Sequence, residues 1–371
     1  MSPFLRFPEF TGEWEEFSLG EIGDSFIGLT YKPTDTVPSG GIIVFRSSNI
    51  QDGCIDYNDI VRVNKKVREN LITKNGDLLI CARNGSSRLI GKNALLHRTD
   101  ANQTFGAFMM VFRSDKNHFV HHLLNTKRYT SQVAENLGAR INQITSSDLS
   151  SFRFFFPKDD KEMTRIASLF DLLDGRIAVQ TRLIDRLQSL MKGIRHRIIN
   201  EAKGKIVCLC EVSDIYQPQT ISSADLTETG YPVYGANGII GHYTSYNHEA
   251  EQVCITCRGN TCGGVNYTKS KSWITGNAMV VNVDRYQNIV SKRYLYHYLS
   301  NCDFNSIISG SGQPQIVRAP LAKFKIILPT VMQQYKIAHC LDVIQNKINV
   351  NSNILNLLIR QKQYLLRKMF I

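Results

Sequence analysis

The feature that most constrains this chain is an internal repeat, which divides its 371 residues into two halves. Residues 138–157 align with residues 310–329 at an offset of 172, and the helical patterns that follow align at an offset of 171. A weaker match pairs residues 19–24 with residues 209–214. A match at a fixed offset indicates one structural module that occurs twice. The matched residues are Gly138, Gln143, Ile144, Leu149, Phe152, Pro157, Ile166, Ala167, Asp171 and Ile177 in the first half, and Gly310, Gln315, Ile316, Leu321, Phe324, Pro329, Ile337, Ala338, Asp342 and Ile348 in the second.

Each half begins with short apolar runs and ends in a long helical pattern. Short apolar runs occur at 41–45, 77–81 and 108–112 in the first half, and similar runs occur at 253–257 and 278–282 in the second. Glycine and asparagine turn signals separate them. The composition, 43% hydrophobic and 20% charged, is that of a globular protein. We therefore expect an α+β fold with two mixed α/β domains in tandem. The expected parts are a first domain at 1–157, a long helix at 158–203, a second domain at 204–329 and a second long helix at 330–371.

The two helical segments share one heptad register. Their apolar seams extend over four to five heptads, and polar residues, Gln180 and Asn351, interrupt both seams at the same place. We expect the helices, each roughly 60 Å long, to pack on each other as a coiled coil. The alternative is two ordinary amphipathic helices on separate cores. The seam residues are Ile166, Phe170, Leu173, Ile177, Gln180, Ile184 and Leu187 in the first helix, and Ile337, Leu341, Ile344, Ile348, Asn351, Leu355 and Leu358 in the second.

A surplus of basic residues indicates a polyanionic partner. Lys and Arg number 44 against 32 Asp and Glu, a net charge of +12, which favours nucleic acid or an acidic membrane face. A soluble enzyme that happens to be basic is the alternative. The first twenty residues do not read as a signal peptide, no run of about 18 apolar residues occurs, and the nine cysteines lack framework spacing. We expect a cytoplasmic protein.

Motifs for catalysis or metal binding are incomplete. The pair Cys254-x-x-Cys257 lacks a second pair at zinc spacing, so buried cysteines are favoured over a metal site. A P-loop-like stretch has five residues between its glycines instead of four, and Asn93 replaces the required Ser or Thr. We expect no catalytic residues, no metal ligands and no cofactor in this chain. The histidines form no triad, and four are expected at the surface: His121, His122, His242 and His248.

Polar loops after the apolar runs are better candidates for function. Arg83 and Arg258 each follow a strand-like run, and the segments 140–143 and 311–315 correspond across the repeat. Arg matches the O6/N7 edge of guanine, Asn or Gln matches the N6/N7 edge of adenine, and Lys suits phosphate contacts. The alternative is ordinary turn residues and solvated charge. The candidate DNA-binding residues are Arg83, Asn84, Ser86, Ser87, Arg88, Arg140, Asn142, Gln143, Tyr234, Asn237, Arg258, Asn260, Thr261, Lys269, Lys271, Gln313 and Gln315.

Several weak motifs also occur in a fixed order along nearly the whole chain. They are Trp14-x-x-Phe17-x-Leu19-Gly20-Glu21-Ile22, Gly310-x-Gly312-Gln313-x-Gln315-Ile316, a proline ahead of each long helix, and a basic ending at 363–369. This order, with its repeat of about 171 residues, resembles the specificity subunit of type I restriction–modification systems. The first half departs from the pattern, because Gly138-Ala-Arg140 stands where the second half has the fuller glycine–glutamine form.

The resemblance implies a function in a restriction system of phage defence. Each variable region would be a target recognition domain that reads one half of a bipartite site in double-stranded DNA. The helices would form an antiparallel coiled coil with pseudo-two-fold symmetry, on which two modification (methyltransferase) subunits dock and restriction (motor and nuclease) subunits join them. S-adenosylmethionine, ATP and Mg²⁺ would be bound by those partners, and this chain would be non-catalytic. The alternatives are a stand-alone DNA-binding protein and a hydrolase with an unrecognised site.

Overall fold

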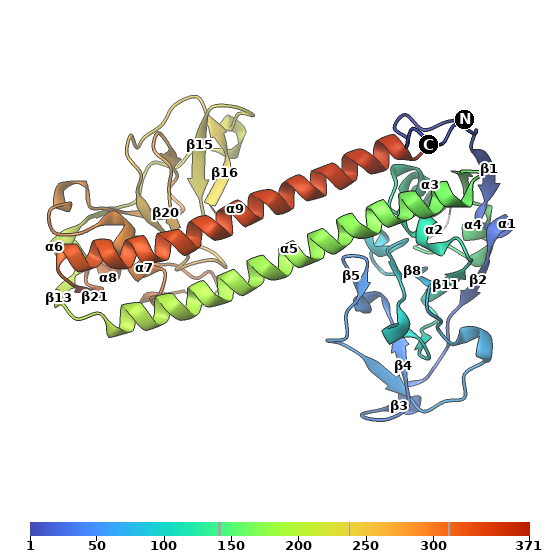
Figure 1. Ribbon diagram of the computed structural model, residues 1–371. Coiled ribbons are helices and arrows are strands. Elements are labelled where there is room, and N and C mark those ends of the chain that lie inside the picture. Colours follow the sequence, from blue (N-terminus) through green and yellow to red (C-terminus); the bar gives the residue numbers. More distant parts are fainter. Residues whose placement is uncertain (140–141, 237, 311) are drawn as a thin grey trace. The chain divides into compact units, whose positions relative to one another are not determined.

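The computed structural model describes residues 1–371 apart from 140, 141, 237 and 311 (Figure 1). Contacts within the chain divide it into two units. The first unit combines Met1–Val179 with Leu355–Ile371, and the second is Gln180–Ile354. Each unit therefore contains one strand-rich region together with a part of each long helix.

A four-stranded antiparallel sheet lies at the centre of each unit, and its strands have the same order in both. The order is β2-β11-β8-β9 in the first unit and β14-β20-β17-β18 in the second. The middle strands β8 and β17 are continuous apolar or small-residue runs and are buried along their whole length. The bounds are β2 Asp24–Ile27, β8 Leu78–Cys81, β9 Asn93–Leu95, β11 Met109–Arg113, β14 Asp214–Tyr216, β17 Val253–Thr256, β18 Val265–Tyr267 and β20 Ala278–Asn282.

The elements around these sheets also correspond. A two-stranded antiparallel ribbon, β1–β12 or β13–β21, joins the start and the end of each strand-rich region. The short helices α1, α2 and α4 have the counterparts α6, α7 and α8, while α3 has none among the described residues of the second unit. The bounds are β1 Glu15–Ser18, α1 Leu19–Ile22, α2 Asn117–Leu123, α3 Lys127–Ala139, α4 Ser146–Ser151, β12 Arg153–Phe156, β13 Lys205–Cys208, α6 Leu209–Val212, α7 Lys292–Leu299, α8 Arg318–Ala322 and β21 Lys325–Leu328.

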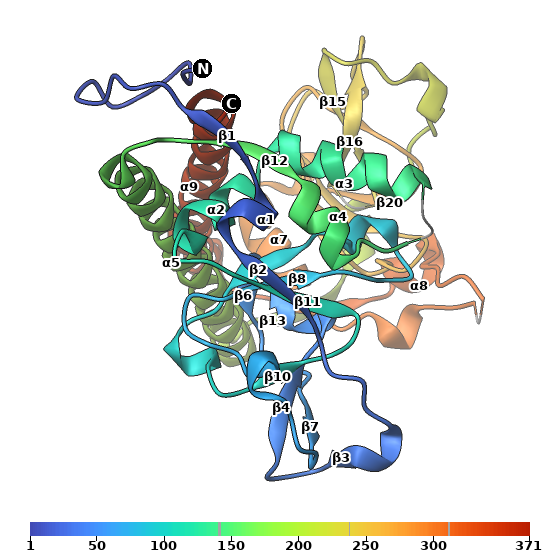
Figure 2. The same cartoon turned by 90° about the vertical axis from the view of Figure 1, so that its right-hand side faces the viewer.

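The units differ in the smaller sheet beside the central one. In the first unit this sheet has the order β10-β4-β7-β3, and the hairpin β5–β6 lies next to it in sequence; in the second unit the order is β16-β15-β19. Figures 1 and 2 show β3, β4 and β7 extending away from the central sheet of the first unit. The bounds are β3 Thr36–Val37, β4 Ile42–Phe45, β5 Ile50–Gln51, β6 Cys54–Ile55, β7 Val61–Val63, β10 Thr104–Phe105, β15 Tyr231–Gly235, β16 Gly238–Tyr243 and β19 Trp273–Ile274. The repeat is therefore a shared framework that carries two different insertions.

The long helices are α5, Asp160–Glu201, and α9, Val331–Met369, and they run antiparallel within each unit. In the first unit the rings of Phe170 and Phe370 are 5.5 Å apart. In the second unit Gln180 Nε2 donates to the carbonyl and to Oδ1 of Asn351, at 3.0 and 2.7 Å. The two polar residues that interrupt the apolar seams are thus hydrogen-bonded to each other. All fourteen seam residues named from the sequence are buried or half-buried. Among the described residues, no helix combines the length and the apolar character needed to cross a membrane.

Burial corrects one expectation and bears on another. His121, His122 and His248 are buried, so their expected position at the surface is wrong. Each is held by hydrogen bonds to neighbouring side chains, which a single sequence does not reveal. Cys254 and Cys257 are also buried, and burial raises the pKa of the Cys254 thiol to about 12. All nine cysteines are free thiols.

Candidate nucleic-acid interface

Two chain segments cross at the end of the central strand of the first unit. Arg83 follows β8 and forms an isolated antiparallel bridge with Gln143. On one side the amide of Ile144 donates to the carbonyl of Ala82 at 2.8 Å, and on the other side the amide of Asn84 reaches the carbonyl of Asn142 at 3.4 Å. Because the backbones are paired here, the exposed guanidinium of Arg83 and the half-buried amide of Gln143 are held on neighbouring segments.

The second unit contains the same crossing. Arg258 follows Cys257, beyond β17, and forms an isolated antiparallel bridge with Gln315. The amide of Ile316 donates to the carbonyl of Cys257 at 3.0 Å, and the amide of Gly259 donates to Pro314, also at 3.0 Å. Each backbone contact therefore has a counterpart in the first unit. The two arginines and the two glutamines that the sequence analysis singled out occupy equivalent positions.

The aromatic neighbour of the arginine differs between the crossings. In the first unit the guanidinium of Arg83 lies 5.3 Å from the ring centroid of Phe108, which is 59% exposed. The carbonyl of Phe108 accepts the amide of Ala82, and in the second unit the carbonyl of Asn277 takes this place by accepting the amide of Cys257. The flat guanidinium of Arg83 is thus stacked before any ligand binds, which reduces the side-chain entropy lost on contact. The asparagine offers Arg258 no such surface.

Loop geometry fixes the residues next to each crossing. Asn84 Oδ1 accepts the amide of Ser86, and its Nδ2 donates to Ser47 Oγ at 3.0 Å. Asn142 has a positive φ of 54° and donates from Nδ2 to the carbonyl of Gly85 at 3.4 Å. In the second unit Gly310 has a φ of +91°, and a Cβ there would lie 2.5 Å from the carbonyl oxygen of Gln313. These hydrogen bonds and backbone angles hold the loops beside each crossing in defined turns.

The other candidate residues are distributed unevenly. Ser86, Ser87 and Arg88 are exposed beside Arg83, and Asn260, Thr261 and Gln313 are exposed near the second crossing. Lys269 and Lys271 are also exposed, but they follow β18, whose antiparallel pairing with β17 places them at the opposite end of β17 from Arg258. Tyr234 is only 6% exposed, and its hydroxyl accepts the amide of Lys269 at 3.1 Å. This position favours a role in the core of its lobe over contact with a base. The candidates Arg140 and Asn237 lie outside the described residues.

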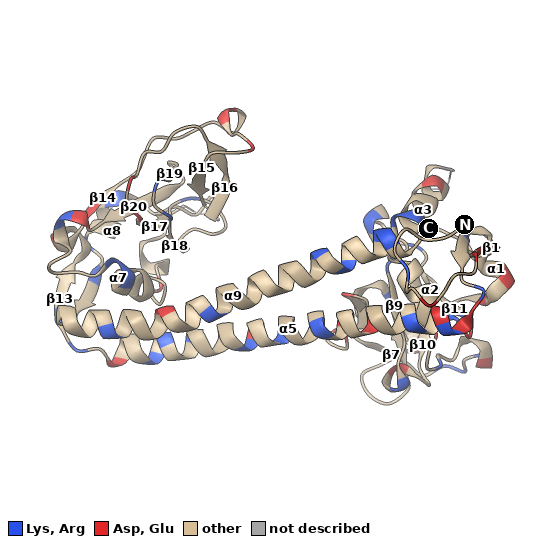
Figure 3. Cartoon of the chain, turned by 45° about the horizontal axis from the view of Figure 1, so that its top comes forward, with Lys and Arg blue, Asp and Glu red and all other residues tan. Residues whose placement is uncertain are grey.

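The basic side chains at the crossings, and Lys269 beyond β18, are free to meet an anion. Within the part of the chain that the structure describes, Arg83, Arg88, Arg258 and Lys269 form no ion pair with a carboxylate. Lys271 lies 3.9 Å from Glu249. Figure 3 shows that lysines and arginines also recur along α5 and α9. Basic side chains without a carboxylate partner are available for the phosphate contacts that a DNA-binding surface makes.

A repeated His–Asp pair attaches each strand-rich region to a long helix, and sequence reasoning missed it. His122 of α2 donates from Nε2 to Asp171 of α5 at 2.9 Å. In the second unit His297 of α7 donates to Asp342 of α9 at 2.7 Å. The aspartates had been matched in the repeat, but the histidines lie 175 residues apart instead of 171, which hid the pairing.

Electrostatics keep both aspartates ionised. Burial alone would raise the pKa of Asp342, but hydrogen bonds from Arg293 and His297 outweigh it and lower that pKa. Burial would also raise the pKa of Asp171, but the hydrogen bond and the charge of His122 outweigh it, so the pKa is lowered. Burial lowers the pKa of His297 to about 4, so this imidazole is neutral at pH 7. Each pair therefore joins an imidazole to an ionised carboxylate.

Comparison with known proteins agrees with this geometry. The family model for the type I restriction modification DNA specificity domain matches residues 11–189 and again residues 202–360. The chain is 31% identical over 148 residues to the type I restriction enzyme EcoprrI specificity subunit of Escherichia coli, which covers 38% of this chain and 36% of that protein. It is 27% identical over 188 residues to the EcoKI specificity subunit of E. coli K12, covering 48% of this chain and 40% of the relative. The matches thus span well under half the length of these relatives.

A solved structure has the same fold along the whole chain. The S subunit of a type I restriction–modification system from M. genitalium superposes with a TM-score of 0.71 at 17% identity, covering 100% of this chain and 99% of that one. At this identity the likeness concerns the fold, and the two matches to the family model supply the relationship. The chain belongs to the family of type I restriction modification DNA specificity domains, of which it contains two in tandem.

Proposed function

We propose that this chain is the DNA sequence-specificity subunit of a type I restriction–modification complex. One recognition domain reads each half of a bipartite site in double-stranded DNA. The observation that carries the proposal is the repeated crossing, in which Arg83 with Gln143 and Arg258 with Gln315 occupy equivalent backbone positions. Arginine and glutamine are the side chains that pair bidentately with guanine and adenine edges. Since the surrounding lobes differ, the two half-sites would differ in sequence.

The long helices would dock two identical modification subunits. Support comes from an exposed apolar stripe that is repeated across the halves: Leu172 and Val179 on α5, and Val343 and Val350 on α9, are each between 55% and 70% exposed. Members of each pair are seven residues apart and so share a helix face. Solvent-exposed apolar stripes of this kind mark protein interfaces. Two equivalent stripes suit two copies of one partner.

Chemistry in such a complex would belong to the partners. The modification subunits would bind S-adenosylmethionine and methylate adenine, and restriction subunits would use ATP and Mg²⁺. This chain would contribute recognition and scaffolding without an active site of its own, and the complex would act in the cytoplasm. Two weak half-site contacts become one tight contact because the second is intramolecular.

The test is methylation of a randomised DNA library by the chain in complex with its modification subunit. The proposal predicts one bipartite methyl-adenine motif, and Arg83→Ala should relax bases in one half of it only. The apolar-stripe variant Leu172→Glu should lower methylation of all sites together. Methylation without sequence preference would refute the proposal.

A further inference from the structure

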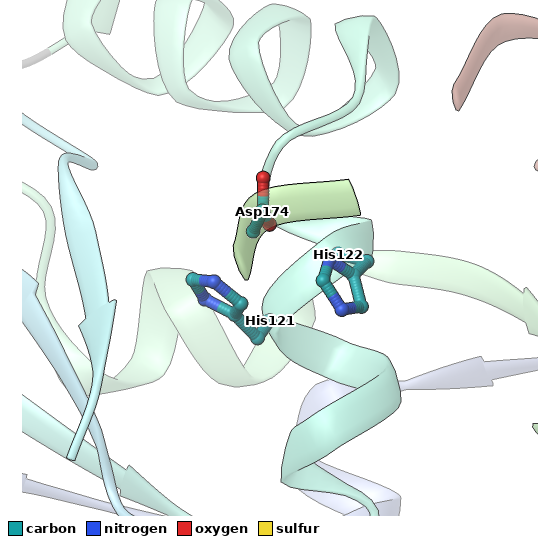
Figure 4. Close-up of side chains that lie close together, drawn as sticks. All are labelled: His121, His122 and Asp174. Atoms are coloured by element: carbon teal, nitrogen blue, oxygen red, sulfur yellow. The ribbon is translucent and has the colours of Figure 1, made fainter. Parts of the chain in front are cut away.

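Two adjacent buried histidines of α2 and a half-buried aspartate of α5 lie close together in the first unit (Figure 4). One side-chain nitrogen of His121, one of His122 and a carboxylate oxygen of Asp174 lie within 4.8 Å of one another. His121 is 8% exposed and His122 is fully buried. Nothing in the recognition of DNA described above uses these groups. Two imidazoles and a carboxylate are a frequent ligand set for divalent transition metals.

Hydrogen bonds to neighbouring side chains fix which nitrogen of each ring holds a lone pair. Asn93 Nδ2 donates to the carbonyls of Gly91 and Leu124, so its Oδ1 faces His121 Nδ1 at 3.1 Å and accepts a hydrogen bond from it. His121 Nε2 is then the lone-pair atom. Burial lowers the pKa of His121 to about 3, which keeps the ring neutral.

The second ring is fixed in the same way. His122 Nε2 donates to the carboxylate of Asp171, which leaves the lone pair on Nδ1. Among the described residues this Nδ1 is completely buried and has no hydrogen-bond partner. A neutral histidine whose other N–H is held by a carboxylate or an amide oxygen is the usual arrangement around a metal ligand.

The cluster already contains a cation. Lys362 of α9 places Nζ 2.5 Å from Asp174 Oδ1. Its positive charge also contributes to the low pKa of His121. An ammonium group therefore neutralises the carboxylate at the position where a metal ion would bind, and a metal ion would have to replace it.

In the second unit other residues occupy the positions of this cluster, although the framework is the same. His297 is equivalent to His122, and its Nδ1 is also buried without a partner among the described residues. Tyr296, Gln345 and Met191 stand where the first unit has His121, Asp174 and Lys362. The ligands and the competing lysine are thus present together or absent together.

We propose that a divalent cation of the Zn²⁺, Co²⁺ and Ni²⁺ class binds His121 Nε2, His122 Nδ1 and the Asp174 carboxylate, in exchange for the ammonium of Lys362. Ligand atoms around tetrahedral zinc are about 3.3 Å apart, so atoms within 4.8 Å reach a common ion through small side-chain rotations. The bound ion joins α2 to α5 and stabilises the first recognition domain. The proposal does not depend on the proposed function.

The test is a Co²⁺ titration of the full chain, followed by its visible absorption. The chain has nine free cysteines, and thiolate binding is recognised by its near-ultraviolet charge-transfer band. We expect one Co²⁺ per chain without that band. Asp174→Asn and His121→Gln should each weaken binding by about 100-fold, Lys362→Met should tighten it by about tenfold, and the matched variant Gln345→Asn should leave it unchanged.

Thermal unfolding separates loss of the site from loss of the fold. Metal-free Asp174→Asn should melt near the unmodified chain, and Zn²⁺ should raise the melting temperature of the unmodified chain but not that of the variant. Equal Co²⁺ binding by all variants, or a thiolate band, would overturn the site. If the Lys362→Met variant bound Co²⁺ and the unmodified chain did not, the proposed exchange would be overturned, because the lysine would then exclude the ion. If neither the unmodified chain nor this variant bound Co²⁺, the site and the exchange would both be overturned.

Discussion

Equivalent aspartates attach the recognition domains to the long helices in the two units, but the basic side chains around these aspartates differ. In the second unit Asp342 accepts hydrogen bonds from His297 and from the guanidinium of Arg293. The Nε of Arg293 lies 3.0 Å from both carboxylate oxygens. In the first unit Asp171 accepts a hydrogen bond from His122. His118 occupies the position of Arg293, with its Nδ1 3.5 Å from Asp171 Oδ2. The framework thus preserves the contact, while its strength differs.

The two halves of the repeat therefore share the geometry of this attachment but differ in its interaction energy. Arginine keeps its charge at all working pH values and forms a two-pronged contact with a carboxylate. A histidine carries charge only when it is protonated. Arg293 also lies over the rings of Tyr267 and Tyr296, at 4.3 and 5.3 Å. The second domain should therefore be attached to its helix more strongly than the first.

Removing the aspartates should give the largest effect. Asp342→Asn leaves Arg293 and His297 without a charged partner, and we expect the free energy of unfolding to fall by about 2 kcal/mol, after allowing for the partial exposure of the pair. Asp171→Asn should lower it by about 1 kcal/mol, because Asp171 is more exposed and lacks the guanidinium. Urea unfolding of the two variants measures both changes. An equal or larger loss in Asp171→Asn would contradict the comparison.

The arginines of the crossings should affect DNA reading and not stability. Arg83→Ala and Arg258→Ala should each weaken binding to the matching half-site by about 1–2 kcal/mol, with the larger loss for Arg83 because Phe108 orders its side chain. Competition binding with half-site-altered duplexes measures this, and Phe108→Leu should give an intermediate loss. If Arg83→Ala prevented assembly with partner subunits, the crossing would have a structural role instead.

Acid should weaken the second unit through His297. Its folded pKa is about 4, below the value of 6.5 for a free histidine. As the pH falls below 6.5 the unfolded chain takes up the proton first, so stability is lost between about pH 6.5 and 4, by about 1.4 kcal/mol per pH unit at most. Unfolding curves at pH 6.5 and 5.5 measure the loss. His297→Gln, which can still donate to Asp342, should reduce this dependence; an unchanged slope would assign it to other groups.

The polar pair between the helices should cost stability. Gln180→Leu with Asn351→Leu replaces a hydrogen-bonded seam pair by apolar side chains, and we expect the free energy of unfolding to rise by about 1 kcal/mol. The single variants should each lower it, since one polar group is left unpaired. A double-mutant cycle followed by thermal unfolding checks both. A destabilised double variant would show that the pair does more than fix the register.

Exchanging the cations should give the smallest effect. His118→Arg makes the first unit resemble the second, and we expect a gain of up to about 0.5 kcal/mol, because the pair is exposed. Arg293→His makes the reverse change and should cost more, since it also removes the stacking on two tyrosines. Unfolding at pH 7 measures both. A gain from Arg293→His would be inconsistent with a stronger attachment of the second domain.

The sequence predicted the features that recur at the offset of the repeat and missed a contact whose residues do not. The repeat and the strand-like runs placed the two frameworks, and Gln180 and Asn351 drew attention because they interrupt both seams together. The pairing of His122 and His297 with these aspartates was missed, because the two histidines lie 175 residues apart and so fall outside the main offset of 171. Tyr234 was named as a candidate DNA-binding residue, and its burial could not be predicted because a tyrosine in a polar loop and a tyrosine at a strand end have the same local sequence pattern.

The central claim is that two recognition domains on one chain read a bipartite site for a methyltransferase. The most direct measurement is single-molecule methylome sequencing of the host with and without this gene. The account predicts that deletion removes methyl-adenine from one bipartite motif, and that Arg83→Ala relaxes one half of that motif. An unchanged methylome, in a host that expresses the chain with its modification subunit, would contradict it.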